Sequence, residues 1–195
     1  MKRFLLLFLA TVVTAWSASA QLSVSQLRTE HLTDPVGIGE RRPLLSWEVS
    51  DASRRGVTQS AYEIRVKSGG RTVWRTGKVA SAESAGVFYD GTPLTSDTRY
   101  TWQVRVWDDR GKASAWSRPA FWRTGLFDVG EWQARWIEPA VSDDLAAMFR
   151  RTFRVTKPVA EATVYVTAHG IYEASVNGHR VSDDLLTPGW TAYKK

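Results

Sequence analysis

The chain has 195 residues, a formal net charge of +6 and no cysteine. The absence of cysteine excludes disulfides, a cysteine nucleophile and a cysteine-ligated metal, so stability must come from apolar burial, to which the 10 tryptophans contribute large side chains. The basic residues are scattered or paired, as at Arg41-Arg42, so no nucleic-acid-binding arm is indicated. A basic surface could favour acidic polysaccharides, but the charge pattern alone favours an ordinary solvated surface.

Residues 1–20 have the features of a cleavable export signal. Lys2 and Arg3 precede an apolar run over residues 4–13, and Ala18-Ser19-Ala20 is typical of a cleavage site. The apolar run is shorter than the ~20 residues that a membrane-spanning helix needs. We therefore expect cleavage between Ala20 and Gln21, no stable membrane anchor, and a periplasmic or extracellular protein.

The stretch over residues 21–125 predicts a first all-β domain. Apolar residues alternate with polar ones in several short segments, and turn residues such as Gly69-Gly70 separate them. The alternating apolar positions are Leu45, Trp47 and Val49, then Tyr62, Ile64 and Val66, then Tyr100, Trp102, Val104 and Val106. About seven strands with this spacing, without a competing helical period, predict a β-sandwich.

Residues 94–106 resemble the corner and the following strand of a fibronectin type III domain. Tyr100 stands where the hydroxyl of a tyrosine corner returns to the upstream backbone. We expect core packing for Trp47, Tyr62, Tyr100 and Trp102. For Trp107, Trp116 and Trp122 both burial and stacking on a sugar ring remain open, although burial is commoner in small sandwiches.

Residues 126–138 read as a linker, and a second β-rich module follows over residues 139–195. Strand-like patterns lie at residues 148–155 and 163–167 and at residues 170–177, where Tyr172, Ala174 and Val176 alternate with polar residues. Asn177-Gly178 suits a type I′ turn, and Arg180 and Val181 would start the return strand. Pro188-Gly189 marks a further turn, before Trp190 and Tyr193.

Three spaced motifs together resemble bacterial α-L-rhamnosidases of glycoside hydrolase family 78. They are G-x-Y-E-x-x-x-N-G-x-x-V with L-x-P-G-W-T-x-Y within residues 170–193, W-Q-A-R-W-I at residues 132–137, and F-R-R-T-F at residues 149–153. The resemblance spans the predicted mature chain. It implies that the second module is the start of a jelly-roll, carbohydrate-binding-like β-sandwich that precedes an (α/α)6 catalytic barrel.

A jelly roll needs about eight strands, whereas residues 139–195 supply about four. The sequence therefore predicts a truncated jelly roll and a fragment without the barrel. The full enzyme would hydrolyse terminal α-L-rhamnose from glycans by inversion, so the expected partner is a rhamnose-containing glycan, reached through the full-length enzyme. The alternative is a stand-alone secreted protein that binds glycans or has a structural role.

No residue of the chain is predicted to be catalytic. Asp143-Asp144 and Asp183-Asp184 are adjacent in sequence, so each pair would point to opposite faces of an extended chain and suits a turn better than a glycosidase site. The resemblance places the acid and base in the missing barrel. The three histidines are widely spaced, so no metal is expected, and without a nucleotide-binding fingerprint no cofactor is expected.

Sugar contact is the remaining function that the residues suggest. Tyr172, Asn177, Trp190 and Tyr193 combine ring faces with amide and hydroxyl groups, which suits the C–H faces and hydroxyl edges of a sugar. A structural role for this module stays open beside direct binding and is favoured, because a fold does not fix a function.

Overall fold

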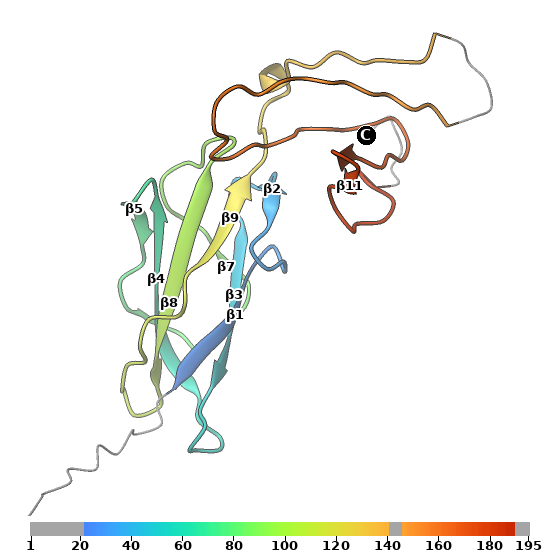
Figure 1. Ribbon diagram of the computed structural model, residues 1–195. Coiled ribbons are helices and arrows are strands. Elements are labelled where there is room, and N and C mark those ends of the chain that lie inside the picture. Colours follow the sequence, from blue (N-terminus) through green and yellow to red (C-terminus); the bar gives the residue numbers. More distant parts are fainter. Residues whose placement is uncertain (1–21, 141–145, 190–195) are drawn as a thin grey trace, which may run out of the picture. The chain divides into compact units, whose positions relative to one another are not determined.

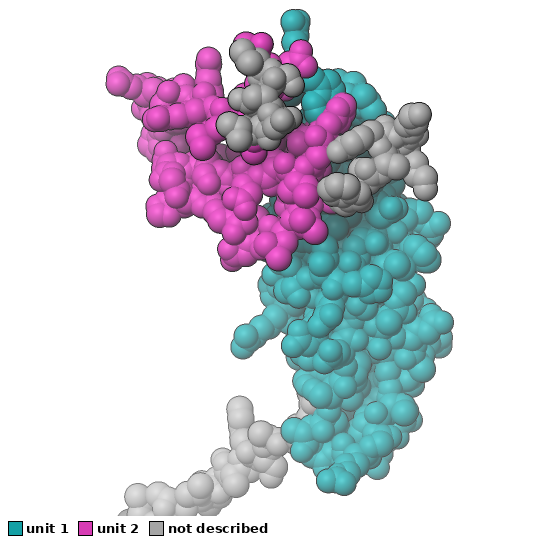
Figure 2. All heavy atoms as spheres, turned by 90° about the vertical axis from the view of Figure 1, so that its right-hand side faces the viewer, with its two compact units in different colours: residues 1–136 teal, residues 137–195 magenta. Residues whose placement is uncertain are grey.

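The computed structural model describes residues 22–140 and 146–189. The predicted export signal, Asp143-Asp144, Trp190 and Tyr193 lie outside these residues. The chain divides into two compact units, residues 1–136 and 137–195, which Figure 2 distinguishes by colour and which are described separately below. Among the described residues, none belongs to a helix long and apolar enough to cross a membrane.

The first unit is built from two β-sheets (Figure 1). The smaller sheet has three strands in the order β1-β3-β7, and the larger has six, in the order β2-β9-β8-β4-β5 with β6 paired to β4. The strands are β1 (Ser23–Thr29), β2 (Val36–Ile38), β3 (Leu44–Ser50), β4 (Gln59–Ser68), β5 (Arg71–Arg75), β6 (Val79–Ala80), β7 (Val87–Phe88), β8 (Arg99–Asp108) and β9 (Ala120–Thr124). The predicted all-β sandwich is confirmed.

Strands β4 and β8 form the centre of the larger sheet, and their register explains the alternation in the sequence. Ile64 pairs with Val104 and Val66 with Trp102, so that apolar residues from both strands point to the same face. The side chains of these pairs are at most 1% exposed. The predicted apolar faces of residues 62–66 and 100–106 are therefore the inner faces of the sandwich.

Aromatic side chains fill much of this core. Trp47 packs edge-on against Tyr62 with ring centroids 5.3 Å apart, and its indole nitrogen donates to Gln59 Oε1 at 3.0 Å. Trp122 is fully buried and stacks on Tyr100 at 5.3 Å. Core packing is confirmed for the four aromatics for which it was expected, and Trp122 joins them. No sugar can reach Trp122 in this fold.

The predicted tyrosine corner is present. The backbone N–H of Thr95 donates to Tyr100 Oη at 2.9 Å, and Tyr100 itself is only 3% exposed. This hydrogen bond ties the loop before β8 to the strand. A buried backbone N–H without an acceptor costs free energy, so the Tyr100 hydroxyl contributes to the stability of the first unit.

Tyr100→Phe removes this acceptor and keeps the ring. We expect the free energy of unfolding to fall by about 1–3 kcal/mol, because the Thr95 N–H loses its partner. Urea unfolding followed by tryptophan fluorescence measures the change. Tyr62→Phe is the matched control, since its ring is also buried and the described contacts give its hydroxyl no hydrogen bond. Equal losses in the two variants would contradict the assignment.

The segment predicted as a linker begins with contacts to the first unit. A short 3-10 turn, η1 (Val129–Glu131), follows β9. Glu131 Oε2 accepts from the Ser96 hydroxyl at 2.7 Å and from the backbone N–H of Phe127 at 2.9 Å. The hydroxyl of Ser96 is the largest of the contacts that lower the pKa of Glu131. These bonds hold residues 127–131 against the loop before β8.

The second unit contains one hairpin of two short strands, β10 (Ser175–Val176) and β11 (His179–Arg180), among its described residues. Asn177 and Gly178 join them with φ angles of 52° and 83°, so the predicted turn with two positive φ angles is confirmed. Of the strand predicted at residues 170–177 only Ser175–Val176 is formed, and the return strand starts at His179, one residue earlier than predicted.

The strands predicted at residues 148–155 and 163–167 are not formed, and this part of the prediction is wrong. Both segments lack strand pairing, and their apolar side chains are largely exposed, for example 94% for Met148 and 78% for Phe153. A strand is stable only when a neighbour accepts its backbone hydrogen bonds and covers its apolar face. Local β propensity in these segments is not enough without that neighbour.

Candidate carbohydrate-binding site

Two of the four predicted sugar contacts lie in the described part of the second unit. Tyr172 is half-buried; its N–H donates to the Thr187 carbonyl at 2.9 Å, and its hydroxyl lies 3.5 Å from the Val166 carbonyl. Asn177 is exposed at the tip of the hairpin. Trp190 and Tyr193 lie outside the described residues.

The hairpin fixes the backbone near these two residues but joins them by no described contact. A hydrogen bond from Val181 N–H to the Ala174 carbonyl at 2.9 Å extends the pairing of β10 with β11 by one step. Tyr172 precedes this ladder, whereas Asn177 closes it. A sugar-binding role for Tyr172, Asn177, Trp190 and Tyr193 therefore stays a prediction.

Of the carboxylates that the sequence singled out in the second unit, Asp183 and Asp184 are described and lie in irregular backbone. Asp184 N–H donates to Ser182 Oγ at 3.0 Å, and the Ser182 hydroxyl donates to Asp184 Oδ2 at 2.6 Å. Both Asp183 and Asp184 are exposed. Over residues 22–140 and 146–189, no three His, Cys, Asp or Glu side chains gather in a way that would hold a metal ion.

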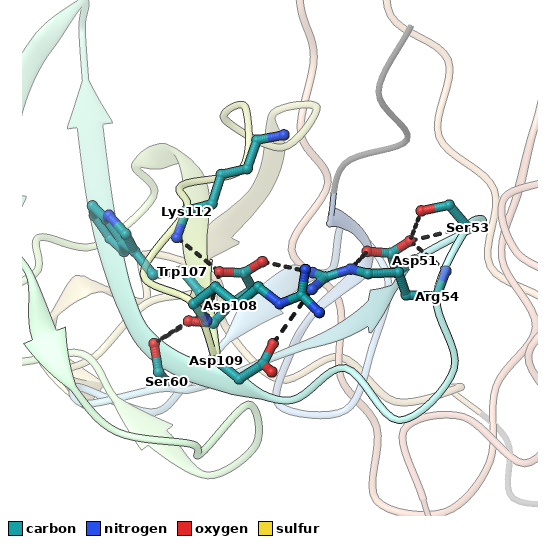
Figure 3. Close-up of polar contacts among 9 residues, drawn as sticks. Asp51, Ser53, Arg54, Ser60, Trp107, Asp108, Asp109 and Lys112 are labelled. Atoms are coloured by element: carbon teal, nitrogen blue, oxygen red, sulfur yellow. Dashed lines mark hydrogen bonds and ion pairs between the residues drawn. The ribbon is translucent and has the colours of Figure 1, made fainter. Parts of the chain in front are cut away.

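One arginine of the first unit is surrounded by three carboxylates (Figure 3). Arg54 donates to Asp108 Oδ2 at 2.6 Å and to Asp51 Oδ2 at 3.4 Å, and its Nη1 lies 3.8 Å from Asp109 Oδ1. Ser60 lies beside them and donates to the Asp108 backbone carbonyl at 2.5 Å. This cluster connects the loop after β3 with the turn after β8.

The surroundings keep the two least exposed carboxyls of this cluster ionised. The backbone N–H of Ser53 contributes most to lowering the pKa of Asp51, to about 2. For Asp108 the backbone N–H of Lys112 contributes most, and Arg54 adds to it against the effect of burial, so the pKa is lowered. A general acid needs a pKa near the working pH. The cluster therefore suits a structural role rather than proton transfer.

A second group of charges, which was not predicted from the sequence, lies on the outer face of the larger sheet. Residues paired directly across antiparallel strands share a face, and the pairs Glu63–Arg105, Arg65–Gln103, Lys67–Thr101, Arg65–Arg75, Arg99–Arg123 and Thr101–Phe121 all lie opposite the core. We call these residues, with Trp107, the outer sheet face. The polar residues of the same alternating segments that predicted the core lie on this face, so their positions in the sequence could have indicated it.

Glu63 is the buried centre of the outer sheet face. Its side chain is 3% exposed and accepts from Arg75 Nε at 2.6 Å and from Arg105 Nε at 2.7 Å. Burial alone would raise the pKa of Glu63, but the hydrogen bonds and charges of the two arginines outweigh it, so the pKa is lowered. One carboxylate thus compensates two cations that come from different strands.

Cations and indole rings alternate beside Glu63. Lys78 lies 4.8 Å from the Trp107 ring, Arg105 lies 5.0 Å from it and from the Trp116 ring, and Arg65 lies 4.2 Å from Trp116. The hydroxyls of Ser114 and Ser117 fix the Trp116 segment by accepting from Val106 N–H at 3.0 Å and Val104 N–H at 3.1 Å. Each of these two indoles contacts two cations, so stacking on a sugar would have to displace them.

A shallow depression of about 270 Å³ lies elsewhere on the first unit. It is lined by Arg41, Arg42 and residues 89–94. Arg42 pairs with Asp90 at 3.2 Å, and Arg41 pairs with Asp128 at 3.1 Å, with all four side chains more than half exposed. Exposed pairs of this kind contribute little energy and do not define a ligand site.

Comparison with known proteins gives matches along most of the chain. Residues 24–128 match the family model of the Rha78A-like, N-terminal immunoglobulin domain, and residues 157–195 match that of the α-L-rhamnosidase N-terminal domain. An α-L-rhamnosidase of Streptomyces avermitilis is 37% identical over 87% of this chain and 19% of its own length, and one of Formosa agariphila is 32% identical over 86% and 20%.

Solved structures give the same result. The S. avermitilis α-L-rhamnosidase, solved with L-rhamnose, matches 62% of this chain and 12% of its own with a TM-score of 0.59 at 43% identity. The Aspergillus terreus α-L-rhamnosidase matches 89% of this chain and 21% of its own with a TM-score of 0.64 at 30% identity. The chain spans about a fifth of the length of the curated relatives that it matches.

Proposed function

The chain belongs to the family of Rha78A-like N-terminal immunoglobulin domains, and on that premise we propose that it serves as the non-catalytic N-terminal region of an exported α-L-rhamnosidase. The family match over residues 24–128 carries the proposal, since it coincides with the unit that has a packed core. The relatives named α-L-rhamnosidase share this region as a fifth of a longer chain.

The chemistry of the described carboxylates supports an accessory role. Inverting glycoside hydrolysis needs an acid and a base ~6.5–9.5 Å apart across a sugar, with one carboxyl protonated in the resting state. Asp51, Asp108 and Glu63 all have lowered pKa values and are held by arginines. They are suited to holding strands and loops together, while a separate domain of the enzyme would cleave terminal α-L-rhamnose by inversion.

The second unit would contribute to the complete enzyme in two ways. Its exposed apolar side chains, such as Phe153 and Leu185 at 78% and 80% exposure, are suited to packing against other parts of the enzyme. Tyr172, Asn177, Trp190 and Tyr193 would supply sugar contacts. Residues 1–20 would direct export, with cleavage after Ala20.

Purified protein is expected to release no aryl alcohol from an aryl α-L-rhamnoside above the buffer rate, because the proposed catalytic domain is a separate one. The full-length S. avermitilis relative is the positive control. Turnover that disappears in Asp183→Asn or Asp184→Asn would overturn the proposal.

Two further measurements on the same protein test its other parts. Titration with L-rhamnose should give weaker binding in Trp190→Ala than in wild type if the second unit contacts sugar, and an unchanged isotherm would limit that unit to a structural role.

N-terminal sequencing of the exported protein should begin at Gln21. Intact Met1 on cytoplasmic protein would contradict the export signal.

A further inference from the structure

The outer sheet face carries a marked excess of positive charge. Its strands contribute the cations Arg65, Lys67, Arg75, Arg99, Arg105 and Arg123, and Lys78 joins them through Trp107. Residues that lie far apart in sequence thus form one basic surface. The sequence alone suggested scattered charges because it does not show this pairing.

Part of this charge is compensated locally. Glu63 binds both Arg75 and Arg105, and Asp97 lies 2.7 Å from Arg123 Nη2. The partners of Arg65 are the Gln103 amide oxygen and the Trp116 ring, and Arg99 lies 3.7 Å from the Phe121 ring. These partners are uncharged, so no described carboxylate offsets the charge of Arg65 or Arg99.

Two lysines add to the uncompensated charge. Lys78 contacts the uncharged ring of Trp107, and Lys67 is exposed on β4 without an acidic neighbour among its described contacts. Together with Arg65 and Arg99 they give four cations that no described carboxylate neutralises. A surface with such a charge excess raises the local concentration of anionic ligands.

Polar uncharged groups lie beside these cations. Arg65 pairs across the sheet with Gln103, and Lys67 pairs with Thr101. Cross-strand neighbours are ~5 Å apart and same-face neighbours along a strand ~7 Å apart, so Arg65 and Lys67 each have an amide or hydroxyl group beside them at about that spacing. This arrangement is suited to a polymer that carries carboxylates at intervals, with hydroxyl groups between them.

We propose that the outer sheet face binds a carboxylated polysaccharide. That the ligand is a glycan rests on the proposed function. That the ligand is acidic rests on the positive charge of the outer sheet face. The planar fork of an arginine matches a carboxylate with two parallel hydrogen bonds. The full enzyme would thereby be held on acidic, rhamnose-containing glycans while its catalytic domain works.

The arrangement fits a nucleic acid less well. Duplex DNA carries one charge per ~1.7 Å, and single strands bind by stacking bases on open aromatic rings. Here Gln103 and Thr101 lie among the cations, and Trp107 and Trp116 each contact two cations already. A carboxylated polysaccharide fits better, because it carries fewer charges per unit length and no bases.

The test is equilibrium binding of the full chain to polygalacturonate, with dextran as a neutral polysaccharide and duplex DNA as a non-glycan polyanion. We expect binding to polygalacturonate that weakens steeply as NaCl is raised, since exposed charges are screened, and no binding to dextran. The triple variant Arg65→Gln, Lys67→Gln and Arg99→Gln should bind about tenfold more weakly, from the loss of three surface charge contacts of ordinary strength.

A second triple variant, Arg28→Gln, Arg55→Gln and Arg110→Gln, is the matched control. It removes the same net charge from three exposed positions off the outer sheet face and should bind like wild type. Thermal unfolding verifies that each variant is folded, and the double variant Lys67→Gln and Arg99→Gln replaces the first triple if that one unfolds.

Absence of binding to polygalacturonate, equal loss in both triple variants, or tighter binding to DNA would each overturn the proposal. None of these results changes the rhamnoside assay, so a failure here is distinguishable from a failure of the proposed function.

Discussion

Trp122→Ala should lower the free energy of unfolding by about 3–5 kcal/mol, the range for removing a buried tryptophan. Trp122 is fully buried between the sheets and contacts two aromatic rings, Tyr100 at 5.3 Å and Tyr89 at 5.9 Å. Alanine would leave a cavity that these rigid rings cannot fill. Denaturant unfolding at constant pH measures the loss. The loss should exceed that of an alanine substitution at either of the two contacting rings, Tyr89 or Tyr100.

Phe88→Ala is the control for the Trp122 prediction. Phe88 belongs to β7 but is 53% exposed, and its ring contacts Arg42 at 5.5 Å. A surface change of this kind usually costs about 0.5 kcal/mol or less. A loss at Trp122 no greater than the loss at Phe88 would mean that the core does not pack around the indole as described.

Arg105→Leu should destabilise the first unit by about 3 kcal/mol, because it leaves the buried carboxylate of Glu63 with one partner, the largely exposed Arg75. Arg99→Leu is the matched control: it removes a cation from the same face of β8 that contacts no described carboxylate. Adding Glu63→Gln to Arg105→Leu should recover part of the loss, since no buried charge then remains. Without recovery, the loss would not come from the unpaired carboxylate.

The same carboxylate makes stability depend on pH with a definite sign. The pKa of Glu63 is lowered from its ordinary value of 4.5 in the folded protein, so the unfolded chain takes up the proton first as the pH falls. The stabilisation is complete above pH 4.5 and is lost as the pH falls towards the folded-state pKa. Glu63→Gln should remove this part of the acid sensitivity in unfolding curves recorded between neutral pH and pH 3.

The sequence by itself determined the features that depend on neighbouring residues. Alternation with a period of two identified the inner faces of β4 and β8, since successive side chains of a strand point to opposite sides. Tyr100 and the Asn177-Gly178 turn were also readable, because each acts on backbone within a few residues. The spaced motifs were sufficient to indicate the family, which the comparisons then showed.

Only the tertiary structure decided which distant residues meet. Glu63 binds Arg75 and Arg105, which are 12 and 42 residues away, and the basic outer sheet face exists because β4, β5, β8 and β9 pair in one register. Residues 163–167 have β-branched side chains but form no strand, because no neighbouring strand pairs with them in the described structure. A strand needs a partner for its hydrogen bonds and apolar face, and that partner lies beyond what local sequence can specify.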